Sequence, residues 1–292
     1  MIEQALYQHL QEQEPLRPYL AEYAGKMAIF NQTVPSDKDP DWGDGPQYGR
    51  IVFSVDLQGN PERTLGGKLT LEILCKDGEQ FPEEIEPILR PLIHGYFFCK
   101  KKFVVSAQWL DTKPFTVPDN KLSGCTLFFD LLAFPVSEYA PYVVTQFNEW
   151  SSTFKNLHVI NRDPLPTEAW KPKNGQTAIY WRVAKEEPCR WIRSTFSTVW
   201  MSATVKGYIF SETPAAAAEV AHRLALQLYA DKRLKKDGTL LRAGESPIMV
   251  NTQNTVDNGA DPLRVGQLSV EATYGAVVHV DREETMITKF VY

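Results

Sequence analysis

Apolar and polar residues alternate along two neighbouring segments in the first third of the chain. Ile51, Phe53 and Val55 stand two positions apart within Tyr48 to Leu57, and Lys68 to Cys75 repeats this spacing. A period of two is typical of a strand that buries one face. The two segments therefore predict a pair of antiparallel strands.

Helical spacing flanks this pair. Residues 2 to 24 carry leucines at mostly helical intervals, and Glu83 to Phe98 carries a stripe of apolar residues three and four positions apart. The stripe predicts a helix that lies on the sheet. Pro87 and Pro91 predict that this helix is kinked or starts late, because each proline removes a backbone donor and Pro91 also opposes a carbonyl. Two more strands are expected to complete this half, at Phe103 to Leu110 and at Cys125 to Phe134.

The second half of the chain repeats the alternating strand of the first. Ile179, Trp181 and Val183 stand 128 positions after the three alternating residues of the first strand. Val199 to Phe210 follows as the expected partner strand. Because a slip of one residue turns every side chain of a strand to the opposite face, agreement in phase is informative.

Loop and helix positions repeat as well. Trp170 follows Trp42 by 128 positions, and each lies in a polar loop before the alternating strand. A second apolar stripe begins at Pro214, 132 positions after Pro82. The expected copy ends with strands at Pro247 to Thr252 and Leu263 to Tyr274.

These repeats predict an α+β fold made of two tandem copies of a small antiparallel sheet packed with helices on one face. The first copy is expected at residues 1–135 and the second, diverged copy at 136–292. A chain of 292 residues is long enough for two domains. The alternative is two unrelated α+β domains that share an order of elements by chance.

Composition narrows the class of protein. The chain has 31 basic and 36 acidic residues, a net charge of -5, without long blocks of one sign, so nothing favours a specific nucleic-acid partner. Met1 to Leu10 lacks the apolar core of a signal peptide, and no segment reaches the roughly 20 apolar residues that span a bilayer. We expect synthesis in the cytosol and no membrane partner.

The cysteines and histidines do not form a recognisable site. The four cysteines contain no Cys-x-x-Cys pair, which favours buried free thiols over a zinc site or a dense disulfide framework. No histidine lies at ligand or acid–base spacing from a second such residue. These residues are Cys75, Cys99, Cys125 and Cys189, and His9, His94, His158, His222 and His279.

Three short motifs are better explained by local structure. Gly66-Gly67-Lys68 lacks the rest of a phosphate-binding loop and predicts a hairpin turn. Asp257 to Asp261 lacks the alternating carboxylates of a calcium loop and predicts a turn. The cations of Lys232 to Lys236 follow the second stripe and suit a helix end. We therefore expect no catalytic, cofactor-binding or metal-ligating residue and no cofactor.

The order of elements resembles that of the tail-terminator, or tail-completion, proteins of long-tailed bacteriophages and prophages. The resemblance covers residues 1 to 135 best and is a pattern match without a residue-level signature. It lies in the opening helix, the loop up to Trp42, the strands, and the helix with an acidic start. These segments are Ile2 to Leu20, Ile51 to Phe53, Leu69 to Leu74, Phe81 to Glu84 and Thr126 to Asp130.

The resemblance implies a structural protein rather than an enzyme. Members of the family form a ring, commonly hexameric, that ends the tail tube and joins it to the head connector. The expected partners are other copies of the chain, the tube protein, and a connector or sheath protein. The expected location is the virion tail or neck, assembled in the bacterial host cytoplasm.

This chain differs from typical members of the family in carrying two such units, whereas they carry one. If both units line the ring, a trimer could supply six units; if one does, a hexamer would. Two alternatives remain open: an enzyme with a site between the two domains, and a neck or baseplate adaptor module.

Overall fold

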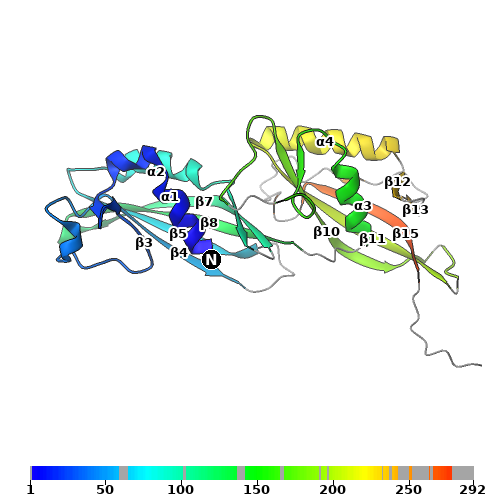
Figure 1. The fold of residues 1–292 in the computed structure, drawn as a ribbon, viewed down its shortest axis with the longest axis horizontal. Helices are drawn as coiled ribbons and strands as arrows, with labels where there is room; N and C mark the ends of the chain where they lie inside the picture. The colour runs from blue at the N-terminus through cyan, green and yellow to red at the C-terminus, as the bar shows by residue number, and fades with distance from the viewer. Residues whose placement is uncertain are drawn as a thin grey trace, which may run out of the picture.

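The structure is a computed structural model that describes most of the chain. The described residues are 2–58, 65–100, 103–136, 142–164, 168–190, 192–195, 197–231, 233–236, 239–242, 250–251, 263 and 266–277. The protein is α+β with mostly strands, built on a six-stranded mixed sheet that curls into a half-barrel and on a second mixed sheet. Figure 1 shows the two sheets side by side along the long axis of the molecule.

The first sheet uses all its strands from the first half of the chain. In spatial order they are β3 (Ile29–Asn31), β4 (Arg50–Leu57), β5 (Leu65–Lys76), β8 (Leu122–Pro135), β7 (Phe103–Val117) and β6 (Phe97–Lys100). The expectation of a wholly antiparallel sheet is wrong, because β3 pairs with β4 in parallel. The connection between these two strands is long enough to cross the sheet end and return in the same direction, which a tight turn cannot do.

Two helices cover one face of this sheet. They are α1 (Ile2–Gln11) and α2 (Pro82–Leu89). Ile51 and Phe53 of β4 are buried in one core with Leu6 of α1 and with Ile85 and Leu89 of α2. The alternating positions of β4 therefore face the helix layer, as their spacing predicts.

The expected helix over Glu83 to Phe98 is shorter than its apolar stripe. It ends at Leu89, and a 3-10 turn, η3 (Arg90–Leu92), follows. Pro91 accounts for the end, since it has no amide hydrogen and its ring opposes the carbonyl of Pro87. After Gly95 the chain turns into β6, so residues 97 and 98, expected at the end of the helix, lie in a strand.

The second sheet has the same spatial order of strands as the first. The order is β9 (Leu157–Val159), β10 (Thr177–Pro188), β11 (Thr198–Phe210), β15 (Leu268–Val277), β13 (Thr239–Arg242) and β12 (Arg233–Lys236), with β14 (Val250–Asn251) also on β15. Its edge strand β9 is parallel to β10, so this sheet is mixed too. It is covered by α3 (Tyr142–Ser151) and α4 (Pro214–Asp231).

The phase predicted for the second half is confirmed. Ile179 and Trp181 are buried in one core with Ala221 and Leu224 of α4. The Trp181 indole donates a hydrogen bond of 2.7 Å to Ser151 Oγ at the end of α3. In both halves the alternating strand thus turns its apolar positions toward the helix that follows its hairpin.

The first half contains an extra segment between its opening helix and its parallel strand. This segment holds η1 (Glu14–Tyr19) and a small hairpin of β1 (Glu22–Tyr23) and β2 (Lys26–Met27). A further turn, η2 (Pro40–Trp42), lies between β3 and β4, and η4 (Pro118–Asn120) joins β7 to β8. In the second half only the turn over residues 152–156 separates α3 from β9.

Within the described part of the chain, no helix combines the length and apolar character needed to cross a membrane.

Candidate functional site

The two sheets meet through the faces that their helices leave uncovered. This junction is an apolar cluster made by the ends of β6, β7 and β8 on one side and by β10 and β11 on the other. Its buried members are Phe97, Val104, Leu132 and Phe134 from the first half, and Ile160, Ala178, Tyr180, Tyr208 and Phe210 from the second. The halves therefore share an apolar core.

Aromatic rings dominate this cluster. The Phe134 ring lies 5.1 Å from that of Tyr180, 5.6 Å from that of Tyr208 and 5.2 Å from that of Phe210, as measured between centroids. Tyr180 also donates its hydroxyl hydrogen to the carbonyl of Pro135 at 2.8 Å. Such tilted and edge-to-face pairs are the preferred aromatic arrangements.

A backbone bridge adds to the junction. Phe97 of the edge strand β6 and Trp170 of the loop before β10 exchange two hydrogen bonds, of 2.7 Å and 3.1 Å. Their rings are stacked with centroids 4.8 Å apart. Trp170 therefore crosses to the other half of the molecule and occupies the free edge of its sheet.

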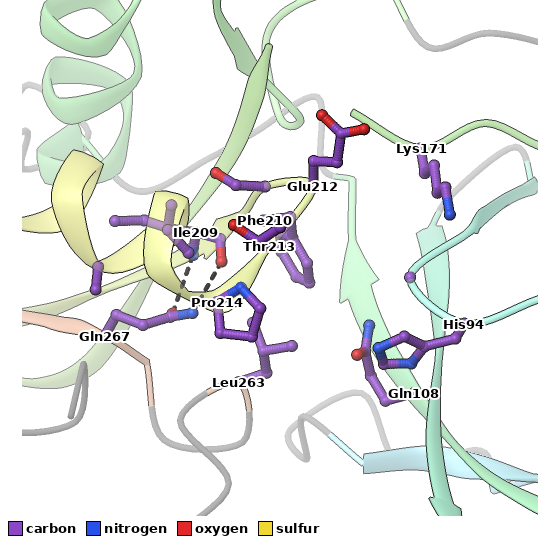
Figure 2. Close-up of a pocket in the computed structure, with 14 residues that line it drawn as sticks. His94, Gln108, Lys171, Ile209, Phe210, Glu212, Thr213, Pro214, Leu263 and Gln267 are labelled. Atoms are coloured by element: carbon purple, nitrogen blue, oxygen red, sulfur yellow. Dashed lines mark hydrogen bonds between the residues drawn. The ribbon is translucent and has the colours of Figure 1, made fainter. Parts of the chain in front are cut away.

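A pocket of about 170 Å³ opens beside the junction. As Figure 2 shows, His94 and Gln108 come from the first half, whereas Lys171, Glu212 and Pro214 come from the second. This is the place where an enzyme site between the halves would lie. The question is whether its polar groups are free to act on a ligand.

His94 and Lys171 line the pocket and have shifted pKa values, as catalytic groups often do. The backbone N–H of Trp109 donates to His94 Nδ1 at 3.1 Å, which leaves the proton of the neutral ring on Nε2. The pKa of His94 is lowered, first by partial desolvation and then by the charges of Lys171 and Arg90, although the ring reaches solvent. The pKa of Lys171 is lowered chiefly by desolvation, and its ammonium donates to the carbonyl of Pro91 at 3.2 Å.

The other polar groups of the pocket hold the backbone. Gln267 bonds both the N–H and the carbonyl of Ile209, at 3.0 Å and 2.8 Å. Thr213 accepts a bond from the N–H of Ala216 and so caps α4, while the Ser211 hydroxyl lies 3.0 Å from that of Thr177. Among the described lining residues, no hydrogen bond or ion pair joins two titratable side chains.

The remaining histidines lie apart. The ring of His9 is within hydrogen-bond distance of the Leu92 carbonyl, at 2.7 Å, and its pKa is lowered chiefly by burial. His158 Nδ1 lies 3.9 Å from an Asp163 carboxylate oxygen, and His222 is exposed on α4. His279 lies outside the described residues. No group of three or more histidine, cysteine or acidic side chains suited to a metal ion occurs in the described part of the chain.

The cysteines are free, as expected from their spacing. Cys75, Cys125 and Cys189 are buried, and Cys99 is half-buried. Burial raises the pKa of the Cys75 thiol to about 11 and that of the Cys125 thiol to about 12. These thiols are therefore protonated at neutral pH and unsuited to nucleophilic attack.

One of the three short motifs of the sequence lies where the structure can test it. Gly66 and Gly67 lie inside β5 next to an irregularity in its pairing with β8, so the expected turn at this position is wrong. The turn expected at Asp257 to Asp261 and the side chains of Lys232 to Lys236 lie outside the described residues.

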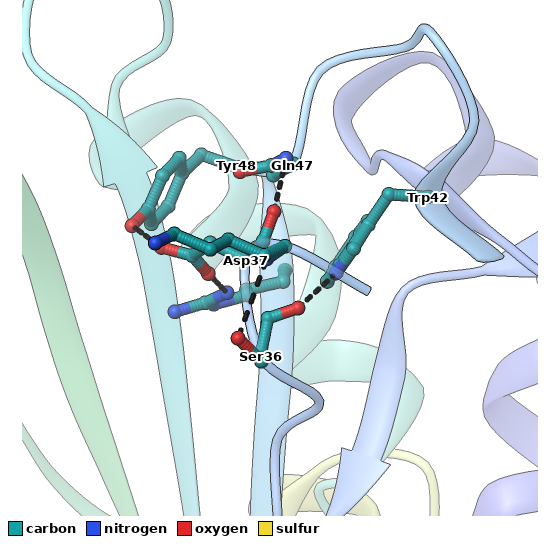
Figure 3. A network of polar contacts seen from close by, with 7 residues as sticks. Ser36, Asp37, Trp42, Gln47 and Tyr48 are labelled. Carbon is teal, nitrogen blue, oxygen red and sulfur yellow. Dashed lines mark hydrogen bonds and ion pairs between the residues drawn. The ribbon is translucent and has the colours of Figure 1, made fainter. Parts of the chain in front are cut away.

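A second polar cluster lies in the loop between β3 and β4, shown in Figure 3. The Asp37 carboxylate accepts hydrogen bonds of 2.7 Å from the Tyr48 hydroxyl and 2.9 Å from Arg50. These two partners lower the pKa of Asp37, the Tyr48 bond most. The Trp42 indole donates to the Ser36 carbonyl at 3.0 Å. The network fixes this loop.

The junction was missed from the sequence, although a signal was present. Tyr180 stands between Ile179 and Trp181, so β10 is apolar on both faces there. A strand with two apolar faces is expected to be covered on both sides.

Comparison with known proteins gives no match to a protein-family model, to a curated protein or to a solved structure.

Proposed function

We propose that the chain is two diverged tandem copies of one α+β unit, residues 1–135 and 136–292, and that it serves as a structural ring protein of a phage or prophage tail. The observation that carries the proposal is the common strand order of the two sheets, β3-β4-β5-β8-β7-β6 and β9-β10-β11-β15-β13-β12. Each sheet begins with a parallel edge strand and continues with an antiparallel hairpin. Chance resemblance would have to reproduce both the order and the directions.

The repeated unit supports assembly as the function. Two copies of a unit in one chain supply two similar surfaces in fixed register, which a ring of such units can use. In the family that the sequence resembles, the ring ends the tail tube. One face of the ring would match the last layer of tube subunits, and the opposite face would present a different surface to the connector. Further tube subunits would then find no matching site.

The pocket supports this assignment over catalysis. Its amide and hydroxyl groups hold the backbone of β11 and α4, and Lys171 bonds the chain across the junction. The amide and hydroxyl groups stabilise the second half, and Lys171 stabilises the contact between the halves. Their loss would change stability and assembly before it changed any chemistry.

Tube polymerisation measures the proposed function directly. Purified protein is added to polymerising tube subunits, and tube lengths are measured in negative-stain images. We expect shorter tubes whose ends carry a ring. Unchanged tube lengths, with no added density at the ends, would contradict a terminator.

A second candidate is an enzyme at the pocket, which His94 and Lys171 favour by converging there with lowered pKa values. The variants His94→Ala and Lys171→Ala separate the two candidates. Loss of a measured turnover with assembly unchanged would support an enzyme. Unchanged turnover of every substrate that the wild type converts would exclude this pocket as its site.

A further inference from the structure

The loop of residues 170–173 reaches from the second half to residues 90–97 of the first. Trp170 exchanges two backbone hydrogen bonds with Phe97, and the two rings are stacked. The Lys171 ammonium donates to a carbonyl of the same segment at 3.2 Å. The loop lies outside the named strands of both sheets, so these contacts can break without loss of a strand. We call residues 170–173 the latch.

Both lysines of the latch lie over the ring of Tyr96 in the first half. The ammonium nitrogens of Lys171 and Lys173 are 5.0 Å and 5.9 Å from the ring centroid. A cation above an aromatic face is attracted to the ring. The two ammonium groups also repel each other: the pKa of Lys171 is lowered first by desolvation and then by Lys173. The latch is thus attached to the first half partly through cations.

Two histidines of the first half lie beside this contact. His9 is 8% exposed, and its ring lies 4.5 Å from that of Tyr96. His94 accepts the backbone N–H of Trp109 at Nδ1, and it lines the pocket together with Lys171 of the opposite half (Figure 2). Protonation of either ring would therefore place a positive charge near the lysines of the latch.

The surroundings favour the neutral form of both rings. The pKa of His94 is lowered by desolvation and then by the charges of Lys171 and Arg90. The pKa of His9 is lowered chiefly by desolvation, and both lysines of the latch lower it further. A backbone hydrogen bond and the charge of Glu12 act on His9 in the opposite direction without reversing the shift.

The charges near the latch balance while both histidines are neutral. Within the described part of the chain, the charged neighbours of the two rings and of the latch are Arg90, Lys171 and Lys173 on one side and Glu12, Glu86 and Glu212 on the other. Arg90 is already paired with Glu86 at 3.5 Å. Two protonated histidines would leave these groups with an excess of positive charge.

We propose that the latch is released by acid, because protonated His94 and His9 repel its lysines from the first half. Charged His94 would also no longer accept the N–H of Trp109. The contribution of the latch is complete above about pH 6.5 and is lost as the pH falls through the two lowered pKa values. The aromatic junction described above still joins the halves, and release frees the edge of β6. The latch acts within one chain, so its release does not depend on ring formation.

Hydrogen exchange at the amides of Phe97 and Trp170 tests this proposal, because each amide donates to the other residue across the latch. After correction for the intrinsic exchange rate, their protection factors should fall about tenfold or more between about pH 7.5 and pH 5. The amide of Ile51 donates to the carbonyl of Ala28 at the far edge of the same sheet and is the internal reference. Its protection should not change.

Variants separate the charge of the histidines from other effects of acid. In the double variant His9→Gln with His94→Gln, the fall in protection should be less than about twofold, because neither side chain can gain a proton. His222→Gln is the matched control, since His222 is exposed on α4, and it should behave as the wild type does. Lys173→Met should also reduce the fall, because it removes one of the charges that the protonated rings face.

Three results would overturn the proposal. One is equal protection of Phe97 and Trp170 at both pH values in the wild type. Another is an equal fall in protection in the wild type and in both the double variant and Lys173→Met, each with native circular dichroism. The third is a fall at Ile51 as large as that at Phe97, because the whole first half would then be unfolding.

Discussion

The junction between the sheets gives the most quantitative prediction. Phe134 is 1% exposed and contacts three rings of the opposite half. Truncation of a buried phenylalanine to alanine costs about 3–5 kcal/mol, from lost transfer free energy and from the cavity left behind. We expect Phe134→Ala to lie in this range. Each ring pair contributes about 0.5–1.5 kcal/mol in addition to its buried area. Because all three pairs join Phe134 to the opposite half, their loss weakens the contact between the halves.

Urea unfolding with hydrogen exchange measured separately on β5 and β11 detects this loss. In the wild type both strands should unfold in one transition, because the halves share the junction core. In Phe134→Ala the two transitions should separate. Phe53→Ala, a truncation in the core of the first half that leaves the junction intact, is the control and should lower the free energy of unfolding of β5 and β11 together, in one transition.

The reasoning is refuted by either of two results. One is a loss below about 1 kcal/mol in Phe134→Ala, since a buried ring cannot be removed from a shared core at so small a cost. The other is separate unfolding of β5 and β11 already in the wild type, which would mean that the junction does not couple the halves.

Three further predictions concern the cores and a histidine. Leu224→Ala should cost about 2–5 kcal/mol in urea unfolding, and Leu92→Ala less, because Leu224 is buried whereas Leu92 is half-buried in a 3-10 turn. Gly207→Ala should destabilise the second half by thermal unfolding, because the added Cβ would lie 2.7 Å from the ring of Trp181. Burial lowers the pKa of His9 from 6.5. The unfolded chain therefore binds the proton of His9 more readily than the folded chain does. The contribution of His9 to the folding free energy is complete above pH 6.5 and is lost as the pH drops through the lowered pKa. A pH series of urea midpoints should show this loss, and the loss should be smaller in His9→Gln.

The sequence was sufficient for the phase of the main strands but not for every strand, because β6, β12 and β13 were not expected. The alternation around Ile51 and Ile179 predicts strands that bury one face, and both residues are buried in the structure. It was insufficient for strand direction, because a pattern of period two is the same in parallel and antiparallel sheets. The parallel pairing of β3 with β4 and of β9 with β10 was therefore not predicted.

The contact between the halves is harder to predict from sequence. It depends on the outward faces of strands: the two apolar faces of β10 at Tyr180 indicate that something covers the second face, but not which element covers it. The different roles of Trp42 and Trp170 have the same origin. Both precede an alternating strand in the sequence, but Trp42 packs on Tyr23 of its own half whereas Trp170 stacks on Phe97 of the other half.

The native mass of the purified chain tests the central claim most directly. Mass photometry and sedimentation velocity over a range of concentrations measure it without any partner. The account predicts a closed species of three or six chains, visible as a ring by negative stain. A monomer at all concentrations, or an open series of ever larger species, would contradict it.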